Sequence, residues 1–323
     1  MAKTVQLKPR TALGKLTYGY SLDDLKRIEN ISFNVWLDDQ LSPNAVRKAE
    51  SEIDLSPFRS ATMTIPEIYR DRVFKGRPSI LSTELVHMTL LRRLFSSRQV
   101  FEMLVEHFSD YIPVELYTDK QLVRLDYDTN VIRKNTLGYY PKMLAAATFH
   151  PAMLNYLNGD TNTASNPNEN FGRELLELFT ITPSAKYTEQ DVKSAAKMLS
   201  GISWKVATDE TVINLSDHHF GDIEVFGFRH PNAPTDSQDE VIQRISNMVS
   251  YLALRPETAT AFSKRMARRF VADRPSATLI KAMAATYSKT KGHIPSVFKT
   301  MVKHQEFAKA GATKVKRPME HLG

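Results

Sequence analysis

Polar side chains follow a helical period within residues 167–178, whose sequence is PNENFGRELLEL. At about 100° per residue, Asn170, Glu174 and Glu177 line one face beside an apolar stripe. Two carboxylates one helical turn apart can bind a hard cation, or their mutual repulsion can separate their pKa values so that one acts as an acid and the other as a base. This face is therefore the first candidate for chemistry in the sequence.

A catalytic interpretation gives a role to each polar residue of this segment. Glu174 and Glu177 act as acid and base or as metal ligands, Arg173 holds an anion or orients a neighbouring group, and the asparagines fix substrate or backbone. His107 approaches from another part of the chain. The predicted catalytic residues are Glu174, Glu177, Arg173, Asn168, Asn170 and His107.

Local pairing explains the start of this helix without any chemistry. Asn166 suits the cap position, Pro167 the first helical position, and Glu169 the third, where a carboxylate meets unpaired backbone amides. Glu169 also stands four residues before Arg173, a spacing at which opposite charges attract on a helix.

A structural role is the alternative for the two glutamates. Their carboxylates would bind basic side chains of another helix, and residues 264–269 (KRMARR) carry lysine and arginine at helical spacing. In this alternative the cluster is a buried polar network that holds helices in register. Removing Glu174 would then leave buried arginines without a partner and lower the stability markedly.

Imidazole groups near carboxylates indicate a second type of site. Asp217 and Asp222 flank His218 and His219, and imidazole together with carboxylate suits a first-row divalent ion. Adjacent histidines on a strand point to opposite faces, so the two imidazoles would not share one ion. The predicted metal ligands are His218, Glu174 and Glu177.

His107 follows Val100 and Leu104 at helical spacing, which places it near an apolar stripe. That position is typical of a core histidine whose ring binds a backbone carbonyl. A structural role for His107 is therefore the alternative to the catalytic one.

Absent motifs exclude several classes of function. The chain has no cysteine, which excludes disulfides, thiolate zinc sites, iron–sulfur clusters and cysteine nucleophiles. It also lacks the glycine-rich loops that cradle nucleotide phosphates and the G-x-S-x-G and H-E-x-x-H patterns of serine hydrolases and zinc proteases. The cofactor that the sequence admits is thus a divalent metal ion held by carboxylates and imidazoles, and no nucleotide is expected.

Basic residues outnumber acidic ones by 43 to 36, which gives a net charge of +7 and permits an anionic partner. Nucleic acid is not expected, because the basic stretches lack interleaved aromatic residues and no known nucleic-acid-binding module is present. Binding of an anionic polymer through residues 264–269 and 314–317 is a third hypothesis, beside an enzyme and an assembly protein.

Helical periods run through most of the chain. Ser21 with Asp24, and Thr188 with Asp191, match the capping box that opens a helix. Pro151 predicts a break between two short helices, because a residue before proline avoids the helical conformation.

Residues 203–228 differ, with short apolar runs separated by Asp, Asn, Gly and His that predict a β-hairpin or an irregular excursion. The fold prediction is mainly α, a single multi-helical domain over residues 1–313. Its parts are N-terminal helices at 1–202, the β or loop excursion at 203–234 and C-terminal helices at 235–313, before a basic tail at 314–323.

No apolar stretch approaches the roughly 20 residues that a membrane helix needs, so no transmembrane segment is predicted. The first ten residues carry basic side chains but no apolar core, so they do not form a signal peptide as written. The chain as written is expected in the cytoplasm, unless a leader was trimmed.

Several motifs together resemble one protein family. Residues 151–158 (PAMLNYLN), 167–178 and 187–192 (YTEQDV) are closely similar to the bacterial family called domain of unknown function 1800, or DUF1800. The similarity continues in the segments 34–43 (NVWLDDQLSP), 106–108 (EHF), 258–262 (TATAF), 265–273 (RMARRFVAD) and 316–318 (KRP). It therefore covers nearly the whole chain.

The resemblance implies a mostly helical single domain that is usually exported. It also implies a partner, because such proteins are often encoded beside an uncharacterised family that resembles alkaline phosphatases and sulfatases. The activity of the family is not established. The residues that match its motifs are His107, Arg133, Asn168, Glu169, Asn170, Arg173, Glu174, Glu177 and His218.

Three positions depart from the family pattern. Phe179 stands where members commonly have a histidine, Ile223 replaces a lysine, and Ile202 replaces a tryptophan. We therefore consider two functions. One is an enzyme with an Asn, Glu, Arg and His site for hydrolytic or modifying chemistry, assisted by a metal ion; the other is a non-catalytic binding or assembly protein, including a diverged inactive family member.

Overall fold

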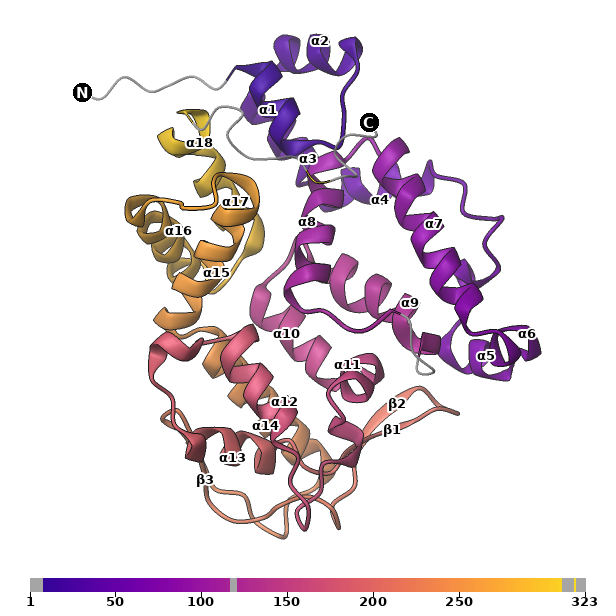
Figure 1. Ribbon diagram of the computed structural model, residues 1–323, viewed down its shortest axis with the longest axis vertical. Coiled ribbons are helices and arrows are strands. Elements are labelled where there is room, and N and C mark those ends of the chain that lie inside the picture. The colour runs from indigo at the N-terminus through magenta and orange to yellow at the C-terminus, as the bar shows by residue number, and fades with distance from the viewer. Residues whose placement is uncertain (1–7, 117–120, 310–316, 318–323) are drawn as a thin grey trace.

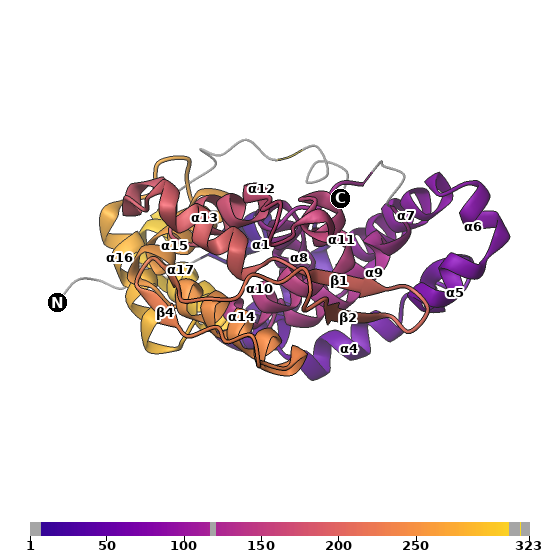
Figure 2. The same cartoon turned by 90° about the horizontal axis from the view of Figure 1, so that it is seen from below.

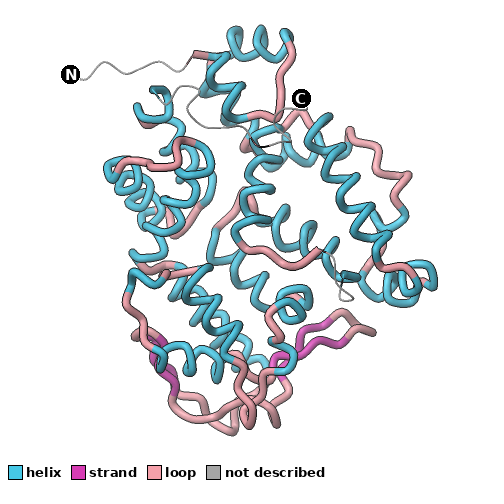
Figure 3. The backbone as a smooth tube through the Cα atoms, viewed as in Figure 1, coloured by secondary structure: helices cyan, strands magenta, loops and turns pink. Residues whose placement is uncertain are grey.

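The computed structural model describes residues 8–116, 121–309 and 317 of the chain. Helices dominate, and the few strands lie toward one end of the molecule (Figures 1 and 3). The predicted mainly α single domain is confirmed. The outline is flat, and α6 (Arg72–Gly76) and α16 (Ala277–Lys289) lie at opposite ends of it (Figure 2).

Helix α8 (Gln99–Tyr111) runs into the middle of the molecule, and α7 (Ser79–Phe95) lies beside it (Figure 1). Shorter helices surround this pair. They are α1 (Pro9–Leu16), α2 (Leu22–Ile31), α3 (Phe33–Gln40), α4 (Pro43–Ser51), η1 (Arg59–Thr62), α5 (Ile65–Arg70), η2 (Gln121–Val123) and α9 (Arg124–Asp126). The Ser21–Asp24 capping box predicted for α2 is confirmed.

Two π-helical segments interrupt the central part of the chain. They are η3 (Tyr127–Arg133) and η5 (Leu175–Phe179), and η5 follows α12 (Glu169–Glu174) without a break. The single helix expected after Pro167 therefore changes its winding halfway, a feature that occurs frequently at functional sites. The other elements here are α10 (Tyr140–Phe149), α11 (Pro151–Tyr156), η4 (Gly159–Thr161), η6 (Pro183–Ala185) and α13 (Glu189–Met198).

Two antiparallel hairpins follow α13. Strands β1 (Ile202–Lys205) and β2 (Glu210–Ile213) pair with Ile202 opposite Ile213, and β3 (Ile223–Val225) and β4 (Phe228–His230) pair with Ile223 opposite His230. The predicted β excursion is confirmed, whereas the subdivision of the domain at residues 202 and 234 stays a prediction.

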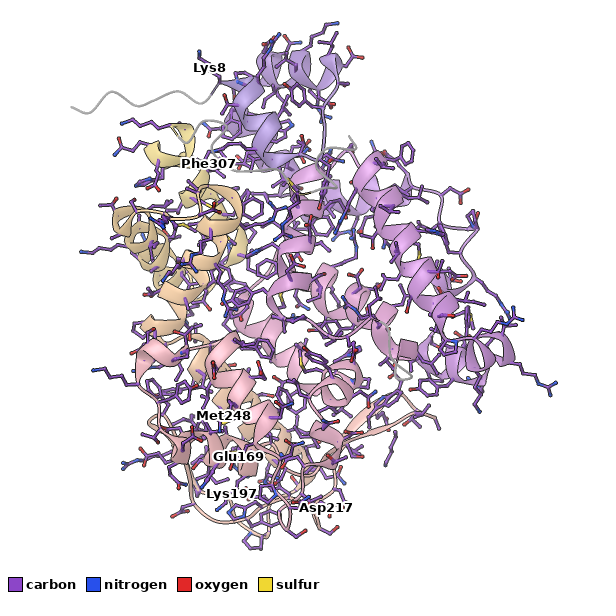
Figure 4. All side chains as sticks on the ribbon, in the orientation of Figure 1. Lys8, Glu169, Lys197, Asp217, Met248 and Phe307 are labelled. Atoms are coloured by element: carbon purple, nitrogen blue, oxygen red, sulfur yellow. The ribbon has the colours of Figure 1, made fainter. Side chains whose placement is uncertain are left out.

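The C-terminal part returns to helices, which are α14 (Gln238–Ala253), α15 (Pro256–Phe270), α16, α17 (Ile294–Lys303) and α18 (Gln305–Lys309). Helix α18 lies against α1, where Lys15 Nζ donates to the carbonyl oxygen of Phe307 at 3.1 Å. Lys8 and Phe307 accordingly mark the same end of the molecule in Figure 4. The predicted basic tail lies outside the described residues except for Arg317, and no described helix combines the length and apolar character needed to cross a bilayer.

Aromatic side chains join α8, α10, α15 and α16 in the core. The ring of Tyr140 lies 5.4 Å from that of Tyr111 and 5.0 Å from that of Phe262, whose ring lies 5.0 Å from that of Tyr287. The Tyr140 hydroxyl donates to the carbonyl oxygen of Phe179 at 2.6 Å, which ties η5 to the same cluster. The ends of α8 and η5 are thereby held close to α15.

A buried ion pair fixes the other end of α8. Arg133 of η3 donates to both carboxylate oxygens of Glu102, at 2.9 and 2.8 Å, and to Glu50 of α4 at 2.8 Å. Glu102 is only 2% exposed, so its charge depends on this guanidinium.

Helix α12 packs very closely on α13. A Cβ atom at Gly172 would lie 2.9 Å from the backbone nitrogen of Ala196 and 2.9 Å from the carbonyl oxygen of Val192. Thr188 and Asp191 form the predicted capping box at the start of α13. Glycine at position 172 is thus what allows the two backbones to meet.

Replacing Gly172 by alanine should therefore destabilise the protein. We expect Gly172→Ala to lower the free energy of unfolding by about 1–3 kcal/mol, because backbone atoms must move to admit the methyl group. The control is Gly14→Ala in α1, where no atom lies within 4 Å of the added Cβ. That change should leave the stability equal or raise it by up to about 1 kcal/mol. Urea unfolding measures both; equal effects of the two changes would contradict the close packing.

Candidate functional site

The start of α12 differs from the prediction by two residues. Asn168, not Asn166, is the cap, and its side-chain oxygen accepts a hydrogen bond from the backbone amide of Asn170 at 2.9 Å. The predicted cap at Asn166 and first helical position at Pro167 are wrong because residues 163–166 form a turn, in which the amide of Asn166 binds Thr163 Oγ1 at 3.1 Å.

Both asparagines bind backbone. The side-chain amide of Asn168 donates to the carbonyl oxygen of Asn158 at 3.0 Å, and that of Asn170 donates to the carbonyl oxygen of Leu157 at 3.4 Å. These bonds attach the start of α12 to the turn after α11. Of the two roles expected for the asparagines, the geometry supports fixing of the backbone.

Arg173 joins α12 to α13. Its guanidinium donates to both carboxylate oxygens of Glu189, at 2.9 and 2.7 Å, and to Glu169 at 3.2 Å. The hydrogen bond to Glu189 is the main reason why the pKa of Arg173 is raised. The expected pairing with Glu169 is confirmed, and the two carboxylates occupy the donors that could otherwise hold an anion.

Glu174 and Glu177 lie where the α-helix passes into the π-helical segment η5. Glu177 accepts a hydrogen bond from the Tyr187 hydroxyl at 3.1 Å. Glu174 forms no hydrogen bond or ion pair within the described part of the chain, and partial burial, followed by the charge of Glu177, raises its pKa above the ordinary value. A partly buried carboxylate that ionises reluctantly is suited to act as an acid.

The pairing of these glutamates with residues 264–269 is not found. Among the described residues, neither carboxylate contacts a basic side chain of α15. Arg269 instead lies near Glu106 of α8, with its Nη2 atom 3.6 Å from Glu106 Oε2. The structural alternative was wrong about the partners, because helical spacing alone does not tell which acidic helix faces a basic one.

His218 lies in a different part of the molecule, at the loop between the two hairpins. Its Nδ1 atom is 2.8 Å from the carbonyl oxygen of Ser200, and its Nε2 atom is 3.2 Å from Asn232 Oδ1. Asn232 also accepts a hydrogen bond from Arg244. Both ring nitrogens of the buried imidazole are therefore engaged within the protein.

The donors expected to share a metal ion are thus not brought together. His218 has no ring nitrogen to offer, which leaves Glu174 and Glu177 as carboxylate ligands. In the residues that the structure describes, no group of three or more His, Asp or Glu side chains is arranged to hold an ion. The residues present do not fit the predicted imidazole and carboxylate site.

His107 lines a cavity of about 480 Å³ between α8, η5 and α15. Helix α15 contributes three arginines to its wall, and η5 contributes one apolar side chain. The lining residues are His107, Asp110, Tyr111, Pro113, Leu178, Arg265, Arg268, Arg269, Asp273 and Arg317.

Two buried polar side chains at this cavity lack a hydrogen-bond partner among the described residues. The Nε2 atom of His107 is one, and the hydroxyl oxygen of Tyr111 is the other. His107 is only 6% exposed, and its ring lies 5.8 Å from that of Phe270. The Nε2 atom of His107 is therefore available to a bound molecule.

Burial and the nearby arginines together keep His107 neutral. Burial, followed by the positive charges of Arg269, Arg317 and Arg265, lowers the pKa of His107 to about 3. A neutral imidazole can donate one hydrogen bond and accept another. The site therefore combines a neutral histidine with a strongly positive surrounding field.

Glu106 forms ion pairs with some of these arginines. It accepts hydrogen bonds from the Tyr18 hydroxyl at 2.5 Å and from Arg317 at 2.7 Å, and its Oε2 atom lies 3.8 Å from Arg93 Nη2. Burial raises the pKa of Glu106, but the hydrogen bond from Tyr18 and the nearby arginines outweigh it and hold the pKa below the ordinary value.

Sequence reasoning did not connect the basic segment of α15 with His107. The signal was present, since Arg265, Arg268 and Arg269 share one side of a helix and His107 stands beside an acidic residue that attracts cations. The basic segment was instead expected to pair with Glu174 and Glu177, because the spacing of those two carboxylates is the clearer helical pattern.

The contrast between Glu174 and Glu102 tests whether the predicted acidic face is structural. We expect Glu174→Gln to change the free energy of unfolding by no more than about 0.5 kcal/mol, because no ion pair is lost. Glu102→Gln is the matched control and should cost about 3 kcal/mol or more, because it leaves Arg133 buried with a weakened partner. Urea unfolding measures both. A loss of more than about 2 kcal/mol for Glu174→Gln would support the assembly network, because a change of that size requires the loss of a buried interaction.

Comparison with known proteins identifies the family of the chain. The model of the family described as protein of unknown function (DUF1800) matches residues 11–322. No curated protein and no solved structure gives a significant match. Because the match spans almost the entire sequence and agrees with the resemblance of its separate motifs, the chain belongs to the DUF1800 family.

Proposed function

We propose that the protein binds a ligand with an anionic oxygen group, such as a phosphate, sulfate or carboxylate, in the cavity beside His107. The observation that carries this proposal is the buried Nε2 atom of His107, which has no hydrogen-bond partner among the described residues and lies at a wall to which four arginines contribute. A buried polar atom without a partner costs about 1–3 kcal/mol, so a ligand that bonds this atom would offset that cost.

The charges around the cavity favour an anion. Arg265 and Arg268 form no ion pair with any residue that the structure describes, and the guanidinium carbon of Arg265 lies 4.4 Å from the centroid of the Tyr111 ring. Asp110 lies at the cavity but accepts from Arg317 at 2.5 Å. Guanidinium groups bind carboxylate, sulfate and phosphate oxygens through paired hydrogen bonds, so these two arginines are the primary anion-binding groups.

A bound anion should raise the pKa of His107. Its pKa is low because burial and cations disfavour the imidazolium form. A bound anion opposes both effects and strengthens a hydrogen bond donated by Nε2. Anion binding should therefore be coupled to proton uptake in acid solution, and it should strengthen as the pH falls through the raised pKa toward the free value of about 3.

Calorimetry with inorganic sulfate and with inorganic phosphate tests the proposal. We expect both ions to bind at low ionic strength, and Arg265→Gln to weaken each by tenfold or more, because a charge-assisted hydrogen bond is lost. The control Arg229→Gln removes the same charge from β4, where the side chain is 79% exposed and pairs with Glu224. It should leave the affinity within twofold. Absence of binding, or equal affinities for the two variants, would contradict the anion site.

A second candidate function is acid–base catalysis on the bound ligand. The observation that favours it is Glu174, a partly buried carboxyl with a raised pKa and no partner within the described residues. Leu178, four residues later in η5, lines the cavity, so the segment that carries Glu174 borders it. In this function Glu174 acts as the acid in hydrolytic or modifying chemistry, and its burial, followed by the charge of Glu177, raises its pKa.

Carboxyl ¹³C NMR of Glu174 tests this second function. The side chain should titrate above the ordinary value of 4.5, and Glu177→Gln should lower that pKa because the repelling charge is removed. The Tyr187→Phe variant is the control, since it removes the hydrogen bond to Glu177 but keeps the charge. A Glu174 pKa at or below the ordinary value would rule out the acid role.

A further inference from the structure

A second cavity adjoins the first along α15. It has a volume of about 520 Å³ and shares Arg265 and Arg268 with the cavity beside His107. These two arginines therefore lie between the two spaces. We infer that the cavities form one groove that binds an elongated acidic sugar chain, an inference that rests on the proposed anion site and names its ligand class.

One stripe of α15 forms the floor of this groove. The residues that line the two cavities start at Pro256 and recur along one side of the helix to Arg269. At 1.5 Å per residue, this floor is about 20 Å long. That length exceeds what a single phosphate or sulfate ion needs, and it suits a chain of linked units.

The two ends of the groove offer different chemistry. The His107 end holds the arginines and the unpartnered imidazole nitrogen. The other end holds the hydroxyl groups of Thr182, Ser184 and Thr260, together with Lys264. Thr260 Oγ1 donates to the carbonyl oxygen of Pro256 at 2.9 Å, and Thr182 Oγ1 lies 2.9 Å from Ser184 Oγ, so these oxygens keep acceptor positions for the hydroxyl groups of a sugar. The cations select for carboxylate or sulfate substituents.

Positive charge extends along the whole groove. Lys264 and Arg268 are exposed, and neither forms an ion pair among the residues that the structure describes. The one carboxylate of the second cavity, Glu257, is engaged by Arg255, with 3.3 Å between Arg255 Nε and Glu257 Oε2. An acidic chain would therefore meet cations at both ends and no unpaired carboxylate at the hydroxyl end.

Other elongated ligands fit less well. Single-stranded nucleic acid is held by aromatic rings on which bases stack, yet the second cavity has no aromatic residue in its lining, and the Tyr111 ring at the first is covered by Arg265. An extended peptide commonly adds to the edge of a sheet, whereas this groove is lined by helices and turns.

Binding of defined sugars tests the inference on the full chain. The probes are galacturonic acid, its linear tetramer, a sulfated galactose tetramer and an uncharged galactose tetramer. We expect the acidic tetramers to bind at least tenfold more tightly than the monomer, and the uncharged tetramer not to bind. Whichever of the carboxylated and sulfated tetramers binds more tightly identifies the acidic group that the groove prefers.

Variants separate the two ends of the groove. Lys264→Gln should weaken binding of the preferred tetramer by fivefold or more and leave the monomer and inorganic sulfate unchanged. Lys281→Gln is the matched control, because Lys281 is exposed on α16 and lines neither cavity. Arg265→Gln should weaken monomer and tetramer alike.

Three results would overturn the inference. If sulfate and the monomer bind but the tetramers bind no more tightly, the elongated groove is wrong while the anion site stands. If a single-stranded oligonucleotide of equal charge binds more tightly than either acidic tetramer, the sugar class is wrong. If neither inorganic anions nor any acidic sugar binds, the proposed function itself fails.

Discussion

Helix α8 places two carboxylates and a histidine inside the protein, and the rest of the structure is arranged around them. Glu102, Glu106 and His107 are all less than a tenth exposed. A buried carboxylate is tolerated only when cations and hydrogen-bond donors surround it. The chain meets this constraint with Arg133 from η3 at Glu102, and with Arg93, Arg269 and Arg317 at Glu106. Segments far apart in the sequence are thereby fixed to one helix.

The cavity beside His107 follows from that arrangement. Glu106 draws Arg269 and Arg317 to one side of α8, and the next residue along the helix is His107. Arg265 and Arg268 come to the same place because they share a face of α15 with Arg269. The cations therefore exceed what Glu106, Asp110 and Asp273 neutralise, and the imidazole between them stays neutral. A structural ion pair and the proposed anion-binding surface are thus two consequences of burying one carboxylate.

The sequence allowed the local features to be predicted, since each depends on neighbouring residues. Capping boxes at Ser21 and Thr188, the break at Pro151 and the hairpins after residue 202 were all found where expected. The cap at Asn168 was missed because the preceding turn competes for Asn166. Tertiary pairing could not be predicted, because several acidic helices offer the spacing that matches residues 264–269. The bond from the Tyr140 hydroxyl to the carbonyl oxygen of Phe179, at the end of η5, is likewise a tertiary contact that the local sequence does not reveal.

The protonation state of His107 tests the central claim most directly. Ring ¹⁵N NMR across a pH titration, with and without sulfate, reports it for one residue. The account predicts a neutral ring at neutral pH, a pKa near 3 without sulfate, and a clear rise in that pKa when sulfate is added. A ring that titrates near the ordinary value of about 6.5 and does not respond to sulfate would contradict the buried cationic site.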